Sequence, residues 1–140
     1  MRELLFRGKK VKPSVFDETD WVYGSLIDSG NHEQVAIYPW YDGASTMSVR
    51  QLVYSRMEAV KPETVGQFIG LTDKNGKNIF EGDILDADGD VYVCFWDEGN
   101  FEFGLKNKKE SFGIAYVASP NIEILGNIYD NPELLKEVAQ

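Results

Sequence analysis

Hydrophobic and polar positions alternate over short stretches of this chain, a pattern that indicates β-strands rather than long helices. In residues 21–27 (WVYGSLI), Trp21, Tyr23 and Ser25 fall on one side of the expected strand and the residues between them on the other. Similar runs, bounded by Gly, Pro, Asn or Asp, recur along the chain. They cover residues 3–11, 34–40, 65–71, 78–87, 90–96, 100–105, 113–118 and 122–128.

Residues 48–60 (SVRQLVYSRMEAV) carry two conflicting signals. The segment is rich in β-branched residues and ends close to Pro62, which favours a strand with a loop. We favour strand or irregular structure here, and residues 43–62 are the part whose structure the sequence defines least. The helical alternative rests on apolar side chains at i, i+3, i+4 spacing, namely Val49, Leu52, Val53, Met57 and Val60.

The last segment, DNPELLKEVAQ, predicts a short C-terminal helix. Asn131 is a suitable cap, Pro132 suits the first helical position, and Glu133 falls in the first turn, where the helix dipole favours an acid. Leu134, Leu135 and Val138 then form an apolar stripe.

The composition is that of a soluble globular protein, with 43% hydrophobic and 26% charged residues among 140. We expect a single domain over residues 1–140 that needs neither disulfides nor metal. The N-terminal MRELLFRGKK lacks the apolar core of a signal peptide, and no apolar run has the length of a membrane span. The one cysteine, Cys94, agrees with a reducing cytosol, so we expect a cytoplasmic protein.

The net charge of −9 argues against nucleic acid as the main partner, because phosphate binding leaves a basic footprint. The positive residues do form a cluster near the N-terminus. It consists of Arg2, Arg7, Lys9, Lys10 and Lys12, with a smaller group at Lys106, Lys108 and Lys109.

The stretch GLTDKNGKNIFEGDIL, residues 70–85, has the composition of a binding loop. Counted from Asp73, it lacks the sixth-position Gly and twelfth-position Glu of an EF-hand, and Gly76-Lys77 is not followed by the Ser or Thr of a phosphate loop. Asn75-Gly76 is the strongest short signal for a β-hairpin. We therefore predict a type I′ turn between two strands.

The carboxylates that follow this stretch also have the composition of a binding site. Asp86, Asp88 and Asp90 alternate along one loop and could hold a cation, but Asp88-Gly89 also predicts a hairpin turn, which we favour. Together with Glu81 and Asp83, these residues would support a carboxylate- or metal-dependent hydrolase only if their side chains converge in a pocket. We assign no catalytic, metal or cofactor-binding residue.

Cys94 and His32 are each the only residue of their kind. Cys94 lies within the alternating run VYVCFW, where a small core thiol belongs, and His32 lies in the polar turn SGNHE. We therefore do not expect them to form a nucleophilic pair.

The segment IYPWYDG, residues 37–43, gathers aromatic side chains around Pro39. Aromatic residues of this kind cover the edge of a core or supply protein interfaces. Tyr38, Trp40 and Tyr41 are the candidate interaction surface.

Four segments in order along the chain resemble the YopX family of proteins encoded by bacteriophages and prophages. They are MRELLFRGKKV, WVYGSLI, VKPETVGQFIGLTDKNGKNIFEGDIL and IEILGNIYDNPELL. The resemblance implies a mostly β, complex fold of bent and coiled sheets, and a bacterial cytoplasm. It supplies no catalytic or binding residues. The matching residues are of the kinds that fix turns and caps: Gly66, Gly70, Gly76, Gly82, Gly126 and Pro132.

The function we expect is that of a non-enzymatic accessory protein that works by protein contact, as a homo-oligomer or with a host or phage protein. The alternative is a small β-barrel that binds nucleic acid, because residues 80–103 read as barrel-like hairpins. That alternative requires the basic cluster at 2–12 to lie beside exposed aromatic side chains.

Overall fold

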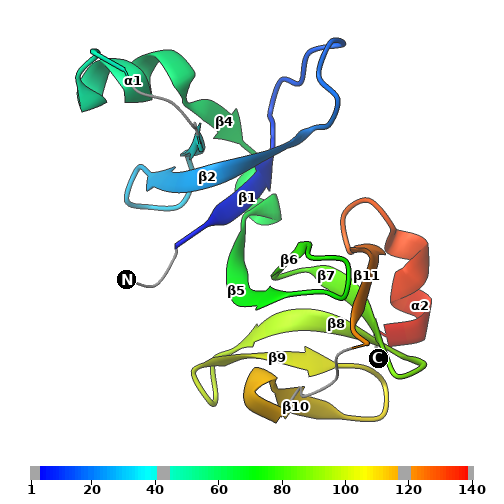
Figure 1. Cartoon of the computed structure of the whole chain (residues 1–140). Helices are drawn as coiled ribbons and strands as arrows, with labels where there is room; N and C mark the ends of the chain where they lie inside the picture. Colours follow the sequence, from blue (N-terminus) through cyan, green and yellow to red (C-terminus); the bar gives the residue numbers. More distant parts are fainter. Residues whose placement is uncertain (1–3, 41–44, 117–120, 139–140) are drawn as a thin grey trace. The chain divides into compact units, whose positions relative to one another are not determined.

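A computed structural model describes residues 4–40, 45–116 and 121–138 of the chain. The backbone divides into two compact units, Met1–Gln67 and Phe68–Gln140. Figure 1 shows the elements of each unit in sequence colours. The single domain over residues 1–140 stays a prediction. The fold class is confirmed, since strands dominate both units.

The first unit is an antiparallel sheet in the order β4-β3-β2-β1-β5. Val60 of β4 also bridges Lys10, just beyond β1, so the sheet curls back toward its own start. A 3-10 turn, η1 (Pro62–Thr64), leads into the last strand. The strands are β1 (Phe6–Lys9), β2 (Trp21–Asp28), β3 (Val35–Pro39), β4 (Glu58–Val60) and β5 (Gly66–Thr72), the last of which continues into the second unit.

Alternation decides which side of this sheet is the core. On β3, Val35 and Ile37 are buried, whereas Ala36 and Tyr38 face the other way and are half-buried. The inward side chains form one cluster of apolar residues, whose burial is the main stabilising term for the unit. The cluster contains Val22, Val35, Ile37 and Val60, with Phe6, Leu26 and Val65 packed against it.

Residues Val49–Arg56 form a helix, α1, so the strand or irregular structure favoured for this segment is wrong. The reason is local. Ser48 forms a capping box with Gln51: its side chain accepts from the Gln51 N–H, and the Gln51 side chain accepts from the Ser48 N–H. None of the residues of α1 is buried, so the cap contributes directly to a helix that gains little from packing.

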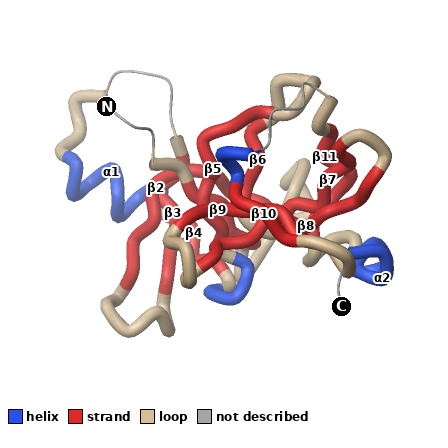
Figure 2. Tube along the Cα trace, turned by 90° about the horizontal axis from the view of Figure 1, so that it is seen from below, coloured by secondary structure: helices blue, strands red, loops and turns tan. Residues whose placement is uncertain are grey.

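The second unit is built on an antiparallel sheet in the order β10-β9-β8-β7-β11. Figure 2 shows these strands together with the short blue helix α2 (Leu135–Val138). The sheet is open, with β10 and β11 at its edges, so the hairpins that suggested a barrel do not close into one. The strands are β6 (Asn78–Phe80), which pairs with β5, β7 (Asp83–Ala87), β8 (Asp90–Asp97), β9 (Glu102–Lys106), β10 (Ser111–Gly113) and β11 (Glu123–Asn127).

Both faces of this sheet are covered by apolar side chains. On one side Ile84 and Val93 meet Ile128, Leu134 and Leu135 from the C-terminal segment. The other side carries the larger cluster. Its buried members are Ile79, Leu85, Tyr92, Cys94, Leu105 and Ile122.

The C-terminal helix is confirmed as η3 (Pro132–Leu134) followed by α2 (Leu135–Val138). Asn131 stands at the cap position without a side-chain cap hydrogen bond. Its Oδ1 instead accepts from the Asn127 N–H at 3.2 Å. The predicted strand 113–118 is wrong, because Ile114–Tyr116 form a 3-10 turn, η2, and residues 117 and 118 lie outside the described part.

No helix in the described ranges has both the length and the apolar character needed to cross a membrane.

Candidate contact surface on the first unit

An aromatic pair lies on the outward face of β2 and β3. Ser25 is opposite Tyr38 and Gly24 opposite Pro39, and the Trp40 N–H donates to the Tyr23 carbonyl at 3.2 Å. The register therefore places Trp40 directly across from Tyr23. The exposed fractions of these side chains are 42% for Tyr23 and 50% for Trp40.

Gly24 is what allows the two strands to approach here. A Cβ atom on Gly24 would lie 1.9 Å from the Tyr38 carbonyl oxygen, closer than any side chain tolerates. The glycine thus holds the β2–β3 pairing in the register that brings Tyr23 and Trp40 together.

The candidate surface predicted from the sequence consists of Tyr38, Trp40 and Tyr41. The structure brings Tyr38 and Trp40 onto one face of the sheet, and Tyr41 lies outside the described residues. Sequence reasoning missed Tyr23. The available signal was the alternation of Trp21, Tyr23 and Ser25, which places Tyr23 on the face opposite the buried Val22. We call Tyr23, Tyr38 and Trp40 the aromatic surface.

An apolar groove continues the same face at the other end of the strands. Ile27 lies opposite Ala36, Ala36 lies opposite Ala59, and the Val11 N–H donates to the Ala59 carbonyl at 3.0 Å. This row crosses the sheet, and its two small alanine side chains form a hollow between larger neighbours. The pocket has a volume of about 460 Å³.

We call this pocket the alanine groove. Met57 and Pro62 add apolar walls, and two carboxylates, Asp28 and Glu33, lie among the lining residues, which include no lysine or arginine from the described ranges. Asp28 accepts hydrogen bonds from the backbone of Gly30 and His32 and pairs with the His32 ring. The Gly30 N–H is the largest reason that the pKa of Asp28 lies below its usual value, so the lining keeps a negative charge.

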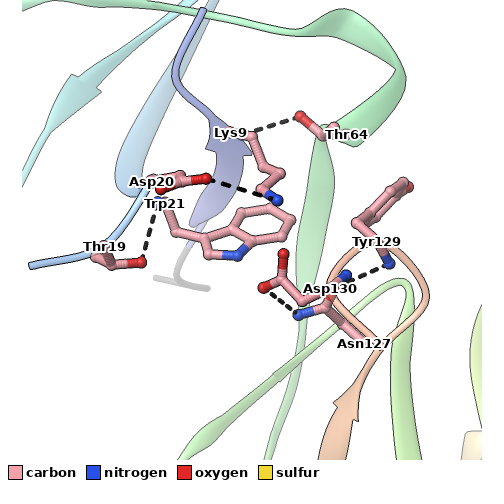
Figure 3. A network of polar contacts seen from close by, with 8 residues as sticks. All are labelled: Lys9, Thr19, Asp20, Trp21, Thr64, Asn127, Tyr129 and Asp130. Carbon is pink, nitrogen blue, oxygen red and sulfur yellow. Dashed lines mark hydrogen bonds and ion pairs between the residues drawn. The ribbon is translucent and has the colours of Figure 1, made fainter. Parts of the chain in front are cut away.

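The basic cluster of this unit is used largely within the unit. The Arg7 guanidinium lies 4.7 Å from the centre of the Trp21 ring, and both residues are buried. In Figure 3, Lys9 reaches Asp20 at 3.7 Å, and its backbone N–H donates to Thr64 Oγ1 at 2.9 Å. Trp21, the aromatic ring that these cations contact, is buried, whereas the 42% exposed Tyr23 lies opposite Arg7 in the β1–β2 register. The basic cluster therefore has one exposed aromatic neighbour, but its nearest ring contact is in the interior.

The turn at residues 73–77 is confirmed, but its predicted type is wrong. Gly76 has a φ of 79°, whereas Asn75 has no positive φ, so the turn is not type I′. The Asp73 carboxylate organises it by accepting from the backbone N–H of Asn75 and of Lys77. Neighbouring Asp88-Gly89 forms the predicted hairpin turn, between β7 and β8, and both residues have the positive φ, 55° and 93°, that a type I′ turn requires.

Two acidic side chains in the segment 81–90 also accept hydrogen bonds from backbone N–H groups. Asp83 is buried and accepts from the Phe80 N–H at 2.8 Å, and Asp86 accepts from the Gly89 N–H at 3.0 Å. Within the described part of the chain, no three His, Cys, Asp or Glu side chains gather as metal ligands would. The metal-dependent form of the hydrolase alternative therefore has no supporting cluster among the described residues.

The remaining sequence candidates also have structural positions. Cys94 is buried in the core of the second unit, as predicted, and His32 is exposed in the β2–β3 turn. Asn127 holds the turn after β11, where its Oδ1 accepts from the backbone of Tyr129 and Asp130 and its Nδ2 donates to the Asp130 carboxylate (Figure 3).

The class of protein to which this chain belongs follows from comparison with known proteins, beginning with the fold. The structure is similar to the crystal structure of protein EF1440 from Enterococcus faecalis, with a TM-score of 0.57, 24% sequence identity, and coverage of 95% of this chain and 98% of that one. No curated protein matches the chain. Residues 15–136 match the family described as YopX protein, and the chain belongs to that family. The resemblance noted in the sequence is therefore confirmed.

Proposed function

We propose that the protein is a non-enzymatic accessory protein of a phage or prophage that acts in the bacterial cytoplasm by protein contact, through the outward face of its first unit. The observation that carries this proposal is the cross-strand pair of Tyr23 and Trp40, both about half exposed on a sheet face that continues into the alanine groove.

The physical support is the cost of leaving such a surface in water. Burying one large aromatic side chain removes about 150–250 Å² from water, so covering two of them and the groove would stabilise a complex appreciably. Aromatic residues at the centre of a patch are also the residue types that dominate interface energies. Contiguous exposed apolar surface of this kind marks interaction sites.

The nucleic-acid alternative has less support. Lys9 and Lys10 are paired with Asp20 and Asp17, and Arg7 is buried against Trp21, so these three cations of the cluster are engaged before any phosphate arrives. The net charge of −9 adds long-range repulsion.

The test compares two surface substitutions on purified, tagged protein. Trp40→Ser removes half of the aromatic pair, and Tyr54→Ser removes an 82% exposed ring from α1, which belongs to neither β2 nor β3. Each variant and the wild type are analysed by light scattering behind a sizing column and by retention of proteins from bacterial lysate, identified by mass spectrometry.

If the proposal is right, the protein forms one discrete complex, either a homo-oligomer or a complex with one identified protein. This complex survives Tyr54→Ser and is lost with Trp40→Ser. Equal effects of the two substitutions, or the absence of any complex, would overturn it. Circular dichroism of both variants confirms that the comparison is between folded proteins.

A further inference from the structure

A second exposed apolar feature of the first unit lies in the loop between β1 and β2. Val15 and Phe16 are 94% and 92% exposed, the highest values among the large apolar side chains of the described chain. Surface hydrophobic residues are common singly, but two adjacent ones at nearly full exposure on one turn are not.

The turn that carries them is held by hydrogen bonds. The Ser14 N–H donates to Asp17 Oδ2 at 2.7 Å, the Asp17 N–H donates to the Ser14 carbonyl at 3.0 Å, and the Phe16 N–H donates to Ser14 Oγ at 3.2 Å. Lys10 Nζ lies 3.2 Å from Asp17 Oδ2 and ties the turn to the strand end. The backbone that carries the two apolar side chains is thus held in one conformation, which lowers the backbone entropy lost when the turn is buried in a partner.

The alanine groove has the properties that such a turn requires. Most of its lining residues are apolar, and its volume of about 460 Å³ falls in the range of pockets that enclose small ligands, large enough for an aromatic and an aliphatic side chain. Val11 lines the groove and Phe16 is five residues further on. Five residues span at most about 18 Å, so the Phe16 backbone lies within that distance of Val11 at the groove.

We propose that the alanine groove receives the Val15–Phe16 turn of a second copy of this chain. Because each copy carries both the turn and the groove in its first unit, two copies can exchange their turns reciprocally about a two-fold axis, the commonest symmetry of protein dimers. This inference rests on the proposed contact function and names its partner as the protein itself.

The charges of the turn oppose this contact only in part, through the exposed Glu18, which has the same sign as the carboxylates of the groove. The chain carries −9 overall, and Asp28 and Glu33 line the groove, so an acidic segment would be repelled. In the loop after β1, however, Asp17 and Asp20 are paired with Lys10 and Lys9. The exposed Lys12, at the start of the same loop, is of the sign that suits the carboxylates of the groove.

The expected area makes this a weak dimer. Two exchanged Phe–Val turns and the grooves that receive them approach only the lower limit of stable interfaces, about 1,200 Å² in total. We therefore expect dissociation constants in the micromolar range or above. Added salt should not weaken the association, since the overall charges of the two copies repel each other.

The experiment uses two complementary variants of the full chain. Phe16→Ser removes the tip of the turn and leaves the groove. Ala36→Leu fills the groove and leaves the turn, with Ala59→Leu as a second filling variant at a more exposed position. Tyr54→Ser is the surface control. Sedimentation velocity over a concentration series gives the dissociation constants, and circular dichroism verifies folding.

The proposal expects a concentration-dependent dimer for the wild type and for Tyr54→Ser, and a dissociation constant raised at least about tenfold in Phe16→Ser and in a groove-filling variant, each measured alone. Mixing those two variants should restore a 1:1 dimer with one intact contact. This recovery is expected of a turn-in-groove contact and not of a general loss of stability.

A wild type that stays monomeric at several hundred micromolar, or a dimer unaffected by Phe16→Ser, would overturn this inference. The contact function would still stand if Trp40→Ser alone abolished a complex, because that outcome places the contact on the aromatic surface and not in the groove. Loss of self-association in both single variants with no recovery on mixing would also count against the exchange of turns.

Discussion

The Asp73 carboxylate joins two segments of the second unit that are 51 residues apart. Its Oδ2 accepts from the backbone N–H of Ile124 on β11 at 3.1 Å, while its Oδ1 accepts from Asn75 and Lys77 in its own turn. The Lys74 N–H donates to the Ile122 carbonyl at 2.8 Å beside it. The turn that has the composition of a ligand loop is therefore a clamp between β5 and β11.

Replacing Asp73 by Ala should destabilise the protein by about 2–4 kcal/mol, because three backbone N–H groups lose a charged acceptor at a buried position. Chemical denaturation of the variant and the wild type measures the change. Asp86→Ala is the matched control, since Asp86 accepts one hydrogen bond in an exposed turn, and it should cost less than about 1 kcal/mol. Equal losses would contradict the clamp.

The same clamp depends on pH. Burial alone would raise the pKa of Asp73, but the N–H groups of Ile124, Lys77 and Asn75 together hold it below its usual value. A lowered pKa in the folded state means that the contribution is complete above the unfolded value near 3.8 and is lost as pH falls through the folded value. Asp73→Asn should flatten this part of the acid unfolding profile.

At alkaline pH, the stability of the protein should depend on the ionisation of Tyr92. Its hydroxyl donates to Glu110 at 2.5 Å, and this hydrogen bond, with burial, raises the pKa of Tyr92 to about 12. The folded pKa lies above the unfolded value of 10.0, so the stability from this pair is complete below pH 10 and is lost as pH rises toward 12. Tyr92→Phe should cost about 1 kcal/mol at pH 7 and flatten the decline between pH 10 and 12.

Denaturation curves at pH 7, 9, 10 and 11 test the Tyr92 prediction. Phe112 packs edge-on against the Tyr92 ring with centroids 5.3 Å apart, and that contact survives in Tyr92→Phe, so the packing of the core is kept. An alkaline decline of the same steepness in variant and wild type would show that other groups cause it.

The sequence predicted most of the strands because their alternation survives into the structure. On β8, Tyr92 and Cys94 face the core as their period of two requires. It mispredicted α1, where β-branched residues outweighed the Ser48–Gln51 capping box, a signal of two residues that stabilises a helix without burying it. It could not show that Asp73 reaches Ile124, since that contact depends on how strands distant in sequence are paired.

The candidate surface was predicted in part for the same reason. Tyr38 and Trp40 stand out as aromatic residues around a proline, but Tyr23 joins them only through the β2–β3 register. The alanine groove has no sequence signature at all, because Ala36 and Ala59 are unremarkable until β3 and β4 lie side by side.

Phe101 holds a backbone conformation that suits glycine. Its φ is 53°, and its side chain is 79% exposed at the end of the β8–β9 turn. A left-handed conformation costs an ordinary residue about 1–2 kcal/mol, so Phe101→Gly should raise the free energy of unfolding by about 1 kcal/mol. Phe101→Ala keeps a Cβ atom and separates backbone relief from loss of the ring. It should bring no comparable gain in thermal unfolding, and a gain equal to that of glycine would refute the argument from strain.

Gly24 connects the stability of the first unit to its candidate surface. A Cβ atom there would lie 1.9 Å from the Tyr38 carbonyl oxygen and 2.9 Å from the Pro39 Cα atom, so Gly24→Ala must push β3 away from β2. We expect a loss of at least about 3 kcal/mol, since backbone and not a flexible side chain has to move. Gly30→Ala is the control for a glycine with open space around it, where only the cost of a φ of 107° applies. Denaturation monitored by tryptophan fluorescence measures both. If Gly24→Ala were tolerated as well as Gly30→Ala, the register that places Trp40 opposite Tyr23 would not depend on Gly24.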